Sequence, residues 1–198
     1  MDLVGGSFDD EAPVRDRWWK VAAGDVVIDV GANEGSYVMP ALAAGAARVY
    51  AFNPGEPDAA MLQRNLDANG FADRCEVIRL AVGDGPGWFS FELSMLFNEE
   101  APGRTRATSL DDWMAGRSDI QRVDWIKIDV EGAEERVIRG AEGLIRRFRP
   151  RMIVENHQFM DNGIEGRVRE LVLGLGLGYT VDGAPWHSVS HSFFEARP

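Results

Sequence analysis

Acidic and amide side chains follow the ends of several apolar runs in this sequence. Asp29, Asn53, Asp84, Asp129 and Glu155 each stand at or just after such a run. Because the carboxyl ends of parallel strands share one edge of a sheet, and ligands bind beyond that edge, we expect these side chains to gather there. Their chemistry would be hydrogen bonding to a polar ligand and proton transfer from an acceptor.

The stretch VVIDVGANEGSY, residues 26–37, has the form of a ligand-binding loop. An apolar run ends in Asp29, and Gly31 and Gly35 let the backbone turn tightly and approach a ligand closely. A dinucleotide loop needs G-x-G-x-x-G and a P-loop needs G-K-[ST], but Asn33 holds the middle glycine position and no G-K-[ST] occurs. The loop therefore favours a cofactor without phosphates, such as S-adenosylmethionine. A tight strand-to-helix turn capped by Asn33 is the alternative.

Composition limits the class of protein. With 198 residues and 45% hydrophobic side chains, the chain can bury one sizeable core. The formal net charge of −11 disfavours nucleic acid and anionic membranes as partners. No run approaches the roughly 20 apolar residues of a membrane span. Because Cys75 is the single cysteine and the first residues lack a basic, apolar leader, we expect a cytoplasmic protein.

Strand and helix signals alternate along the chain, which predicts a parallel sheet with helices on both faces. Expected strands cover 25–30, 47–52, 75–82, 123–130, 151–156, 178–182 and 192–196, with an edge strand or hairpin at 88–93 and a loop at 94–106. Expected helices cover 9–20, 36–44, 57–69, 109–116, one from Gly132 to before Pro150, and one around 168–175.

Five strings in order carry a family resemblance: IDVGANEGSY, VYAFNPGEPDAAMLQRNLDANG, AVGDGPG, TSLDDW and IKIDVEGAEERVIRGA, followed by RPRMIVENH. They resemble the FkbM family of S-adenosylmethionine-dependent methyltransferases over roughly residues 24–160. The resemblance implies the Rossmann-like class I methyltransferase fold, an α/β fold with a seven-stranded, mostly parallel sheet whose last strand is antiparallel. It also implies O-methylation of a hydroxyl on a sugar, natural product or other small molecule. We expect one domain, 1–198, with a helical extension at 1–23 and a C-terminal helix and strands at 161–198.

The same resemblance implies the cofactor site. Its expected residues are Asp29, Gly31, Ala32, Asn33, Gly35, Ser36, Asn53, Ala81, Val82 and Asp84. One position departs from the family pattern, since Asn53 stands where an acid would hold both ribose hydroxyls. Asn53 still forms hydrogen bonds but loses the charge-assisted pair, so replacing it by Glu is expected to tighten cofactor binding. Glu56 is a second candidate for the missing acid.

Acids at the ends of the fourth and fifth strands are the candidate catalytic groups. We assign Asp129, Glu155 and His157 to catalysis, because methyl transfer needs a positioned hydroxyl and a nearby base. Lys127 is expected to form a buried ion pair with a neighbouring carboxylate. His157 has a capping role as its alternative.

A divalent metal on Asp129, Glu155 and Asn156 is chemically possible but not favoured, because Lys127 can occupy the acids. His187 and His191 fall in an expected last loop that can touch substrate. The expected partner is a small-molecule or glycan acceptor. A catalytically inactive, cofactor-binding partner protein is the alternative function, and the oligomeric state is open.

Overall fold

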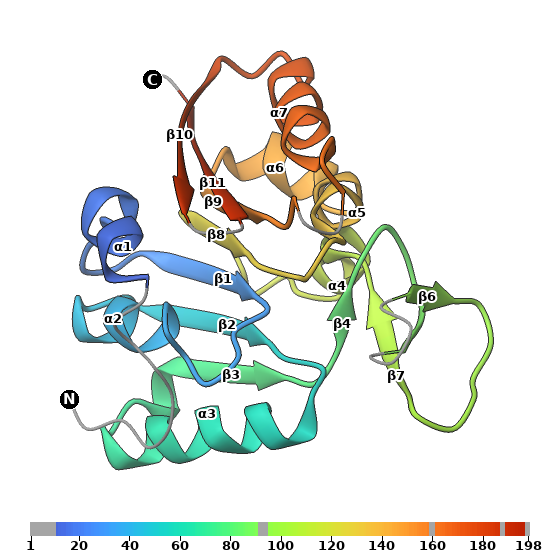
Figure 1. Ribbon diagram of the computed structural model, residues 1–198. Helices are drawn as coiled ribbons and strands as arrows, with labels where there is room; N and C mark the ends of the chain where they lie inside the picture. The colour runs from blue at the N-terminus through green and yellow to red at the C-terminus, as the bar shows by residue number, and fades with distance from the viewer. Residues whose placement is uncertain (1–10, 91–94, 159–160, 187–188, 197–198) are drawn as a thin grey trace.

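The computed structural model describes residues 11–90, 95–158, 161–186 and 189–196. In this part of the chain seven strands form a central sheet, four other strands form a second sheet, and helices cover the central one on both faces (Figure 1). Among these residues no helix has the length and apolarity that a bilayer crossing requires.

The central sheet confirms the expected architecture. From edge to edge it runs β10 (Tyr179–Trp186), β11 (Val189–Ala196), β9 (Arg151–Asn156), β8 (Trp125–Ile128), β1 (Val26–Val30), β2 (Arg48–Phe52) and β3 (Cys75–Ile78). The neighbouring pairs from β9 to β3 are parallel, and β11 is antiparallel to both β9 and β10. The sheet is therefore mostly parallel with an antiparallel last strand.

Alternate residues of the central strands pack into two apolar layers, one on each face of the sheet. Val27 points into the layer built with α1 (Ala12–Trp18), α2 (Val38–Ala43) and α3 (Glu56–Ala68), while Ile28 points into the opposite one. That second layer is built with α4 (Leu110–Ala115), α5 (Glu134–Arg139), α6 (Glu142–Phe148) and α7 (Ile164–Gly174). A short 3-10 turn, Ala72–Arg74, leads into β3. Both faces of the strands are covered, as their apolar runs predicted.

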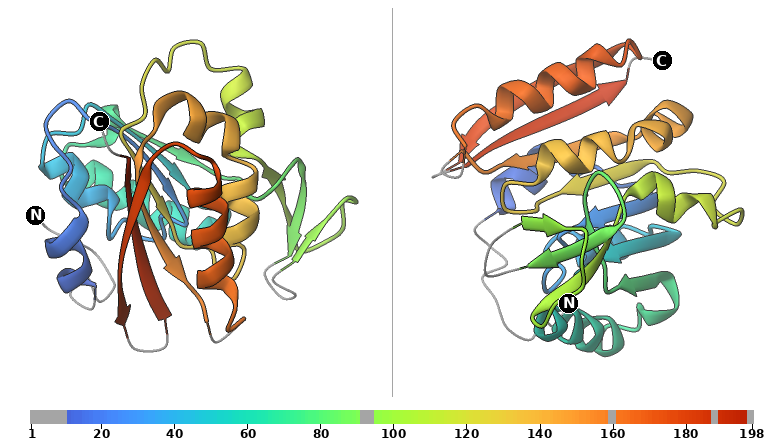
Figure 2. Two further views of the ribbon diagram at one scale, coloured as in Figure 1. Left: turned by 90° about the horizontal axis from the view of Figure 1, so that it is seen from above. Right: turned by 90° about the vertical axis from the view of Figure 1, so that its right-hand side faces the viewer.

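The prediction of one continuous strand over residues 75–82 was wrong. β3 ends at Ile78, and Ala81–Val82 form β4 in the second sheet, in the order β4, β7 (Arg104–Thr108), β5 (Gly87–Ser90) and β6 (Met95–Phe97). The predicted loop at 94–106 was likewise wrong, since it contains β6 and the start of β7. The cause is pairing over distance, because β4 lies parallel to β7. Figure 2 shows this small sheet projecting from the body of the molecule.

The helix predicted from Gly132 to Pro150 is two helices, α5 and α6. Its apolar stripe was correct, since Val137, Ile138, Ala141, Leu144 and Ile145 are all buried. The break comes from tertiary contacts that helical periodicity does not reveal. The carboxylate of Asp111 accepts hydrogen bonds from the N–H groups of Gly143 (2.8 Å) and Leu144 (2.7 Å), and so caps the start of α6.

The last two strands are longer than predicted. β10 and β11 have eight residues each, and they take in most of the expected last loop. His191 therefore lies in β11 and is buried, whereas His187 lies outside the described residues. The position of His191 beside Glu155 in the sheet follows from the register of β11 on β9.

Candidate functional site

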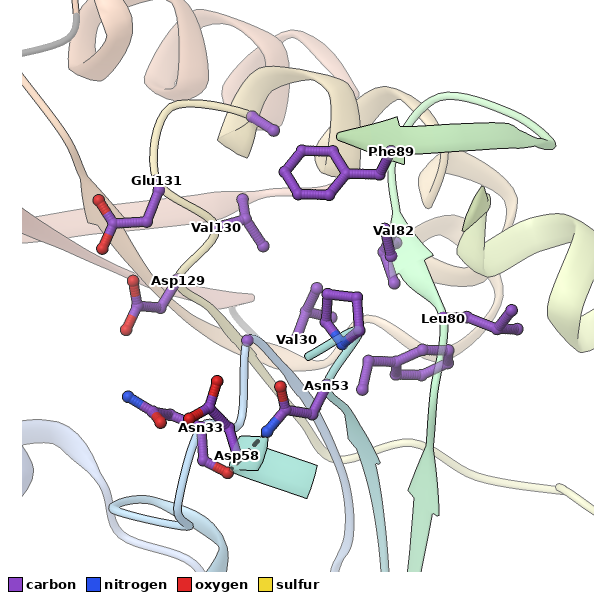
Figure 3. A pocket seen from close by; sticks show the side chains of 15 residues that line it. Val30, Asn33, Asn53, Asp58, Leu80, Val82, Phe89, Asp129, Val130 and Glu131 are labelled. Carbon is purple, nitrogen blue, oxygen red and sulfur yellow. Dashed lines mark hydrogen bonds between the residues drawn. The ribbon is translucent and has the colours of Figure 1, made fainter. Parts of the chain in front are cut away.

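A cavity of about 450 Å³ opens beyond the carboxyl ends of β1, β2 and β8, between them and the small sheet. Its lining comes from six separate segments: Val30, Gly31, Asn33, Phe52, Asn53, Pro54, Asp58, Leu80, Ala81, Val82, Phe89, Asp129, Val130, Glu131 and Ala133. Figure 3 shows Asn33, Asn53 and Asp58 at one end, Leu80, Val82 and Phe89 along one side, and Asp129 and Glu131 opposite. Its place at the strand ends is where α/β sheets bind ligands.

The first loop reaches the cavity through Gly31 and Asn33. Asn33 has a φ of 47°, a left-handed conformation that Asn adopts more readily than most residues. At Gly31 (φ 85°) an added Cβ would lie 1.7 Å from the carbonyl oxygen of Asp129. Gly31 is therefore required by the close approach of the two strand ends. Ala32, Gly35 and Ser36 belong to the same turn but are not among the lining residues.

Asp29 lies behind this loop, not in the cavity lining. Its side chain is 1% exposed, and neither carboxylate oxygen has a hydrogen-bond partner among the described residues. Burial raises the pKa of Asp29 to about 7, although the positive charge of Lys127 opposes the shift. A buried carboxylate without hydrogen bonds is costly, so Asp29 marks the loop as more than a tight turn.

The other predicted cofactor residues lie after β2 and in or after β4. Asn53, Ala81 and Val82 all line the cavity. Asp84 does not, because its carboxylate lies on the surface 3.7 Å from the Nη1 atom of Arg136. Sequence analysis missed Phe89, which reaches the cavity from β5 only because the small sheet folds back over it.

The charge of the lining is acidic. Asp58, Asp129 and Glu131 are carboxylates, and none of the fifteen lining residues is Lys, Arg or His. A pyrophosphate would meet no cation there and three anions, so the cavity does not suit a dinucleotide. A ligand that carries positive charge and an apolar ring fits its acids and its apolar side.

Lys127 is buried next to Asp129. Its side chain is 1% exposed, and its Nζ atom lies 3.2 Å from Oδ2 of Asp129 and 3.9 Å from Oε2 of Glu155. The predicted buried ion pair is therefore present. Burial raises the pKa of Asp129 even against the lowering effect of Lys127. Burial also acts upward on Glu155, but His191 and Lys127 outweigh it and bring its pKa to about 2.

His157 is placed behind Asp129 by a residue that sequence analysis did not find. Its Nδ1 atom lies 2.5 Å from Oε1 of Glu134, whose side chain is fully buried, and its Nε2 atom lies 3.5 Å from Oδ1 of Asp129. Burial lowers the pKa of His157, but the bond to Glu134 and the nearby Asp129 outweigh it, so the net shift is upward. Glu134 thus fixes the orientation of the ring.

Asp129, Glu155 and His157 come together, as predicted, with ligand atoms within 4.8 Å of one another. Asn156 does not join them, because it follows Glu155 in β9 and so points to the opposite face of the sheet. There its amide nitrogen donates to the Ser190 carbonyl (3.0 Å) and to the Ser192 hydroxyl (3.1 Å). The three residues could hold a cation by chemistry alone. The ammonium of Lys127 already lies against one oxygen of Asp129 and one of Glu155, which disfavours a second cation there.

The decisive observation is a match of residues 29–181, well over half of the chain, to the Methyltransferase FkbM domain. This chain belongs to the FkbM methyltransferase family. The segment that matches the FkbM domain contains every lining residue of the cavity, and also Lys127, Glu155 and His157. A comparison with curated proteins finds no match.

Solved structures show the same fold. Methyltransferase FkbM from Methylobacillus flagellatus KT has a TM-score of 0.73 at 17% identity and covers 96% of this chain, which spans about half (48%) of that longer protein. A precorrin 8W decarboxylase from Methanobacterium thermoautotrophicum has a TM-score of 0.63 at 13% identity, covering 98% of this chain and 94% of its own. An rRNA methylase from Streptococcus thermophilus has a TM-score of 0.62 at 14% identity, covering 100% of both chains. At these low identities, the three matches show only that the fold is shared.

Proposed function

We propose that this FkbM-family protein methylates a hydroxyl of a small molecule or glycan, with S-adenosylmethionine as the methyl donor. The observation that carries the proposal is a cavity whose described lining contains three carboxylates and no Lys, Arg or His, in a chain of a methyltransferase family. Its volume of about 450 Å³ is within the range of ligand pockets, roughly 300–1,000 Å³. The cofactor has a net positive charge and an adenine ring, which match the acids and the apolar side.

Two parts of the lining are suited to holding the cofactor. Leu80, Val82 and Phe89 offer an apolar surface for a flat ring. Asn33 and Asn53 offer amide and carbonyl groups at the opposite end. When bound, S-adenosylmethionine supplies an electrophilic methyl group on a sulfonium. The carboxylates of Asp129 and Glu131 lie on the other side of the cavity and are available to the acceptor.

Asp129 is the residue that meets the acceptor hydroxyl. Its carboxylate lines the cavity, one oxygen is held by Lys127, and the other faces His157. The bound cofactor would supply the methyl group for the acceptor oxygen, and Asp129 would take the proton of the acceptor hydroxyl. Because burial raises its pKa, Asp129 is a stronger base than an ordinary aspartate. His157 and Glu134 are positioning residues that hold Asp129 from behind.

The backbone around Glu131 also supports an active site here. Glu131 has a φ of 52°, a conformation that costs energy for a residue with a side chain, and Gly132 follows with a φ of 98°. The turn directs the mostly exposed Glu131 side chain to the mouth of the cavity, with Oε2 3.5 Å from Nε2 of His157. A strongly anionic acceptor would be repelled by these acids and by the net charge of −11, so we favour a neutral acceptor over RNA.

The proposal is tested by methyl transfer from labelled S-adenosylmethionine to a panel of glycosides, polyols and phenols. The expected result is transfer to at least one hydroxyl class by the wild type and loss of transfer in Asp129→Asn. Cofactor binding without transfer to any acceptor class would instead favour an inactive partner protein. Methylation of rRNA with no transfer to small molecules would overturn the acceptor class.

A further inference from the structure

The first turn of α3 carries two acids, and only one of them faces the cavity. Glu56 has a side chain that is 77% exposed, and its Oε2 atom lies 3.2 Å from Nη2 of Arg79 on the surface. It is not a lining residue. Asp58 is an exposed residue that lines the cavity, and no hydrogen bond or ion pair to its carboxylate is found among the described residues. Glu56, the acid considered from the sequence as a substitute, is thus directed elsewhere, and Asp58 is available.

Asn53 is already committed to the first loop. Its Nδ2 atom donates a hydrogen bond of 2.8 Å to the carbonyl oxygen of Asn33, which holds that residue in its left-handed conformation. In Figure 3 this bond is the dashed line, and the side-chain oxygen of Asn53 lies on the other side of the amide, toward the cavity. Asn53 therefore offers one acceptor to a ligand, whereas a pair of neighbouring hydroxyls offers two donors.

We propose that Asp58 supplies the carboxylate that binds the ribose hydroxyls of the cofactor, together with the Asn53 oxygen. The charged acceptor has moved from the end of β2 to the first turn of α3, where the helix dipole favours an anion. Asp58, Asn33 and Asn53 lie together at one end of the cavity (Figure 3). The inference rests on the proposed use of S-adenosylmethionine, and it assigns the ribose contact in this chain to a residue outside the strand end.

The arrangement also reverses the expectation for Asn53→Glu. A carboxylate at position 53 has no hydrogen to donate to the Asn33 carbonyl, so two oxygens would face each other across the 2.8 Å contact. We expect Asn53→Glu to weaken binding, because the loop loses its anchor while Asp58 already provides the charge.

The test is calorimetric titration of S-adenosylhomocysteine into the wild type, Asp58→Asn and the matched control Glu56→Gln. We expect Asp58→Asn to weaken binding about 10- to 100-fold, as for loss of a hydrogen bond to a charged group, and Glu56→Gln to change it less than about twofold. Thermal melts of the ligand-free proteins check that all three fold alike. Equal affinity of the wild type and Asp58→Asn would overturn the inference.

A second ligand distinguishes a direct contact of Asp58 with the ribose from a general effect of its charge on binding. The 2′-deoxy analogue of S-adenosylhomocysteine should bind the wild type more weakly than the parent compound, and the two should bind Asp58→Asn with nearly equal affinity. The same loss on deoxygenation in both proteins would show that Asp58 does not touch the ribose. If the wild type binds neither compound, the proposed function fails, and this outcome differs from failure of the Asp58 assignment.

Discussion

Replacing Glu134 by Gln should remove one buried charge with little change in side-chain size. Glu134 is fully buried, and its Oε1 atom lies 2.5 Å from Nδ1 of His157. Burial alone would lower the pKa of His157, and the net upward shift depends first on this bond and then on Asp129. In Glu134→Gln we therefore expect the pKa of His157 to fall.

The magnitude follows from the linkage between protonation and folding. Because the folded pKa of His157 is raised, its protonation stabilises the fold at low pH, and this stabilisation is lost as pH rises through the folded pKa. A hydrogen bond to a charged group contributes about 1.5–3 kcal/mol, and the His157 side chain is only 3% exposed, so screening by solvent is small. For a chain of this size the expected loss in Tm is about 3 to 12 °C at pH 6. It should become smaller toward pH 9.

Differential scanning calorimetry between pH 5.5 and 9 measures this effect without any acceptor. Glu135→Gln is the matched control, because Glu135 bonds Arg139 (2.8 Å) and Arg167 (2.7 Å) near the surface, and the pair with Arg167 lowers its pKa. Its effect on Tm should be small and nearly constant over this range. A Tm difference for Glu134→Gln that stayed constant with pH would refute the assignment of His157 and Glu134 as a charged pair.

Three further variants follow from the same geometry. Asp129→Asn should lower turnover by about 10² to 10⁴, because the acceptor hydroxyl loses its base. It should also lower Tm, because Lys127 loses the charge of its nearer partner. Full turnover per folded molecule would exclude Asp129 from catalysis. Gly31→Ala should destabilise the fold by about 2 kcal/mol or more in denaturant titrations, whereas Gly24→Ala, at a similar φ but with nothing within 4 Å, should cost less; equal losses would mean that strand approach is not the cause. In Asp29→Asn the Tm relative to wild type should rise from about pH 4 to about pH 7 and then level off, because over this window the unfolded wild type loses the Asp29 proton that its folded state keeps. A pH-independent difference over this window would contradict the raised pKa.

The central sheet was predictable because its signal is local. Apolar runs separated by helical stretches predicted β1, β2, β8 and β9 to within a few residues. The small sheet was not predictable in this way, because β4 pairs with β7, and no periodicity links Ala81 to its partner Ala107. The break between α5 and α6 has the same origin, since its cap is Asp111 from a different helix.

Strand ends in the sequence predicted which side chains would lie at this edge of the sheet, but lining residues away from strand ends were missed. Asp129 and Asn53 end strands, so parallel-sheet geometry placed them at the cavity. Asp58 is in a helix, and spacing alone does not say which of two acids in one turn faces a ligand. Glu134 becomes a partner of His157 only when α5 packs beside β9. The sequence shows two adjacent acids in the first turn of α5, Glu134 and Glu135, and does not say which one is buried.

Titration of the wild type with S-adenosylhomocysteine and, separately, with NAD tests the central claim most directly. The acidic, base-free lining of the cavity predicts saturable binding of S-adenosylhomocysteine and no binding of NAD, whose pyrophosphate would face Asp58, Asp129 and Glu131. Tight binding of NAD with no response to S-adenosylhomocysteine would contradict the account.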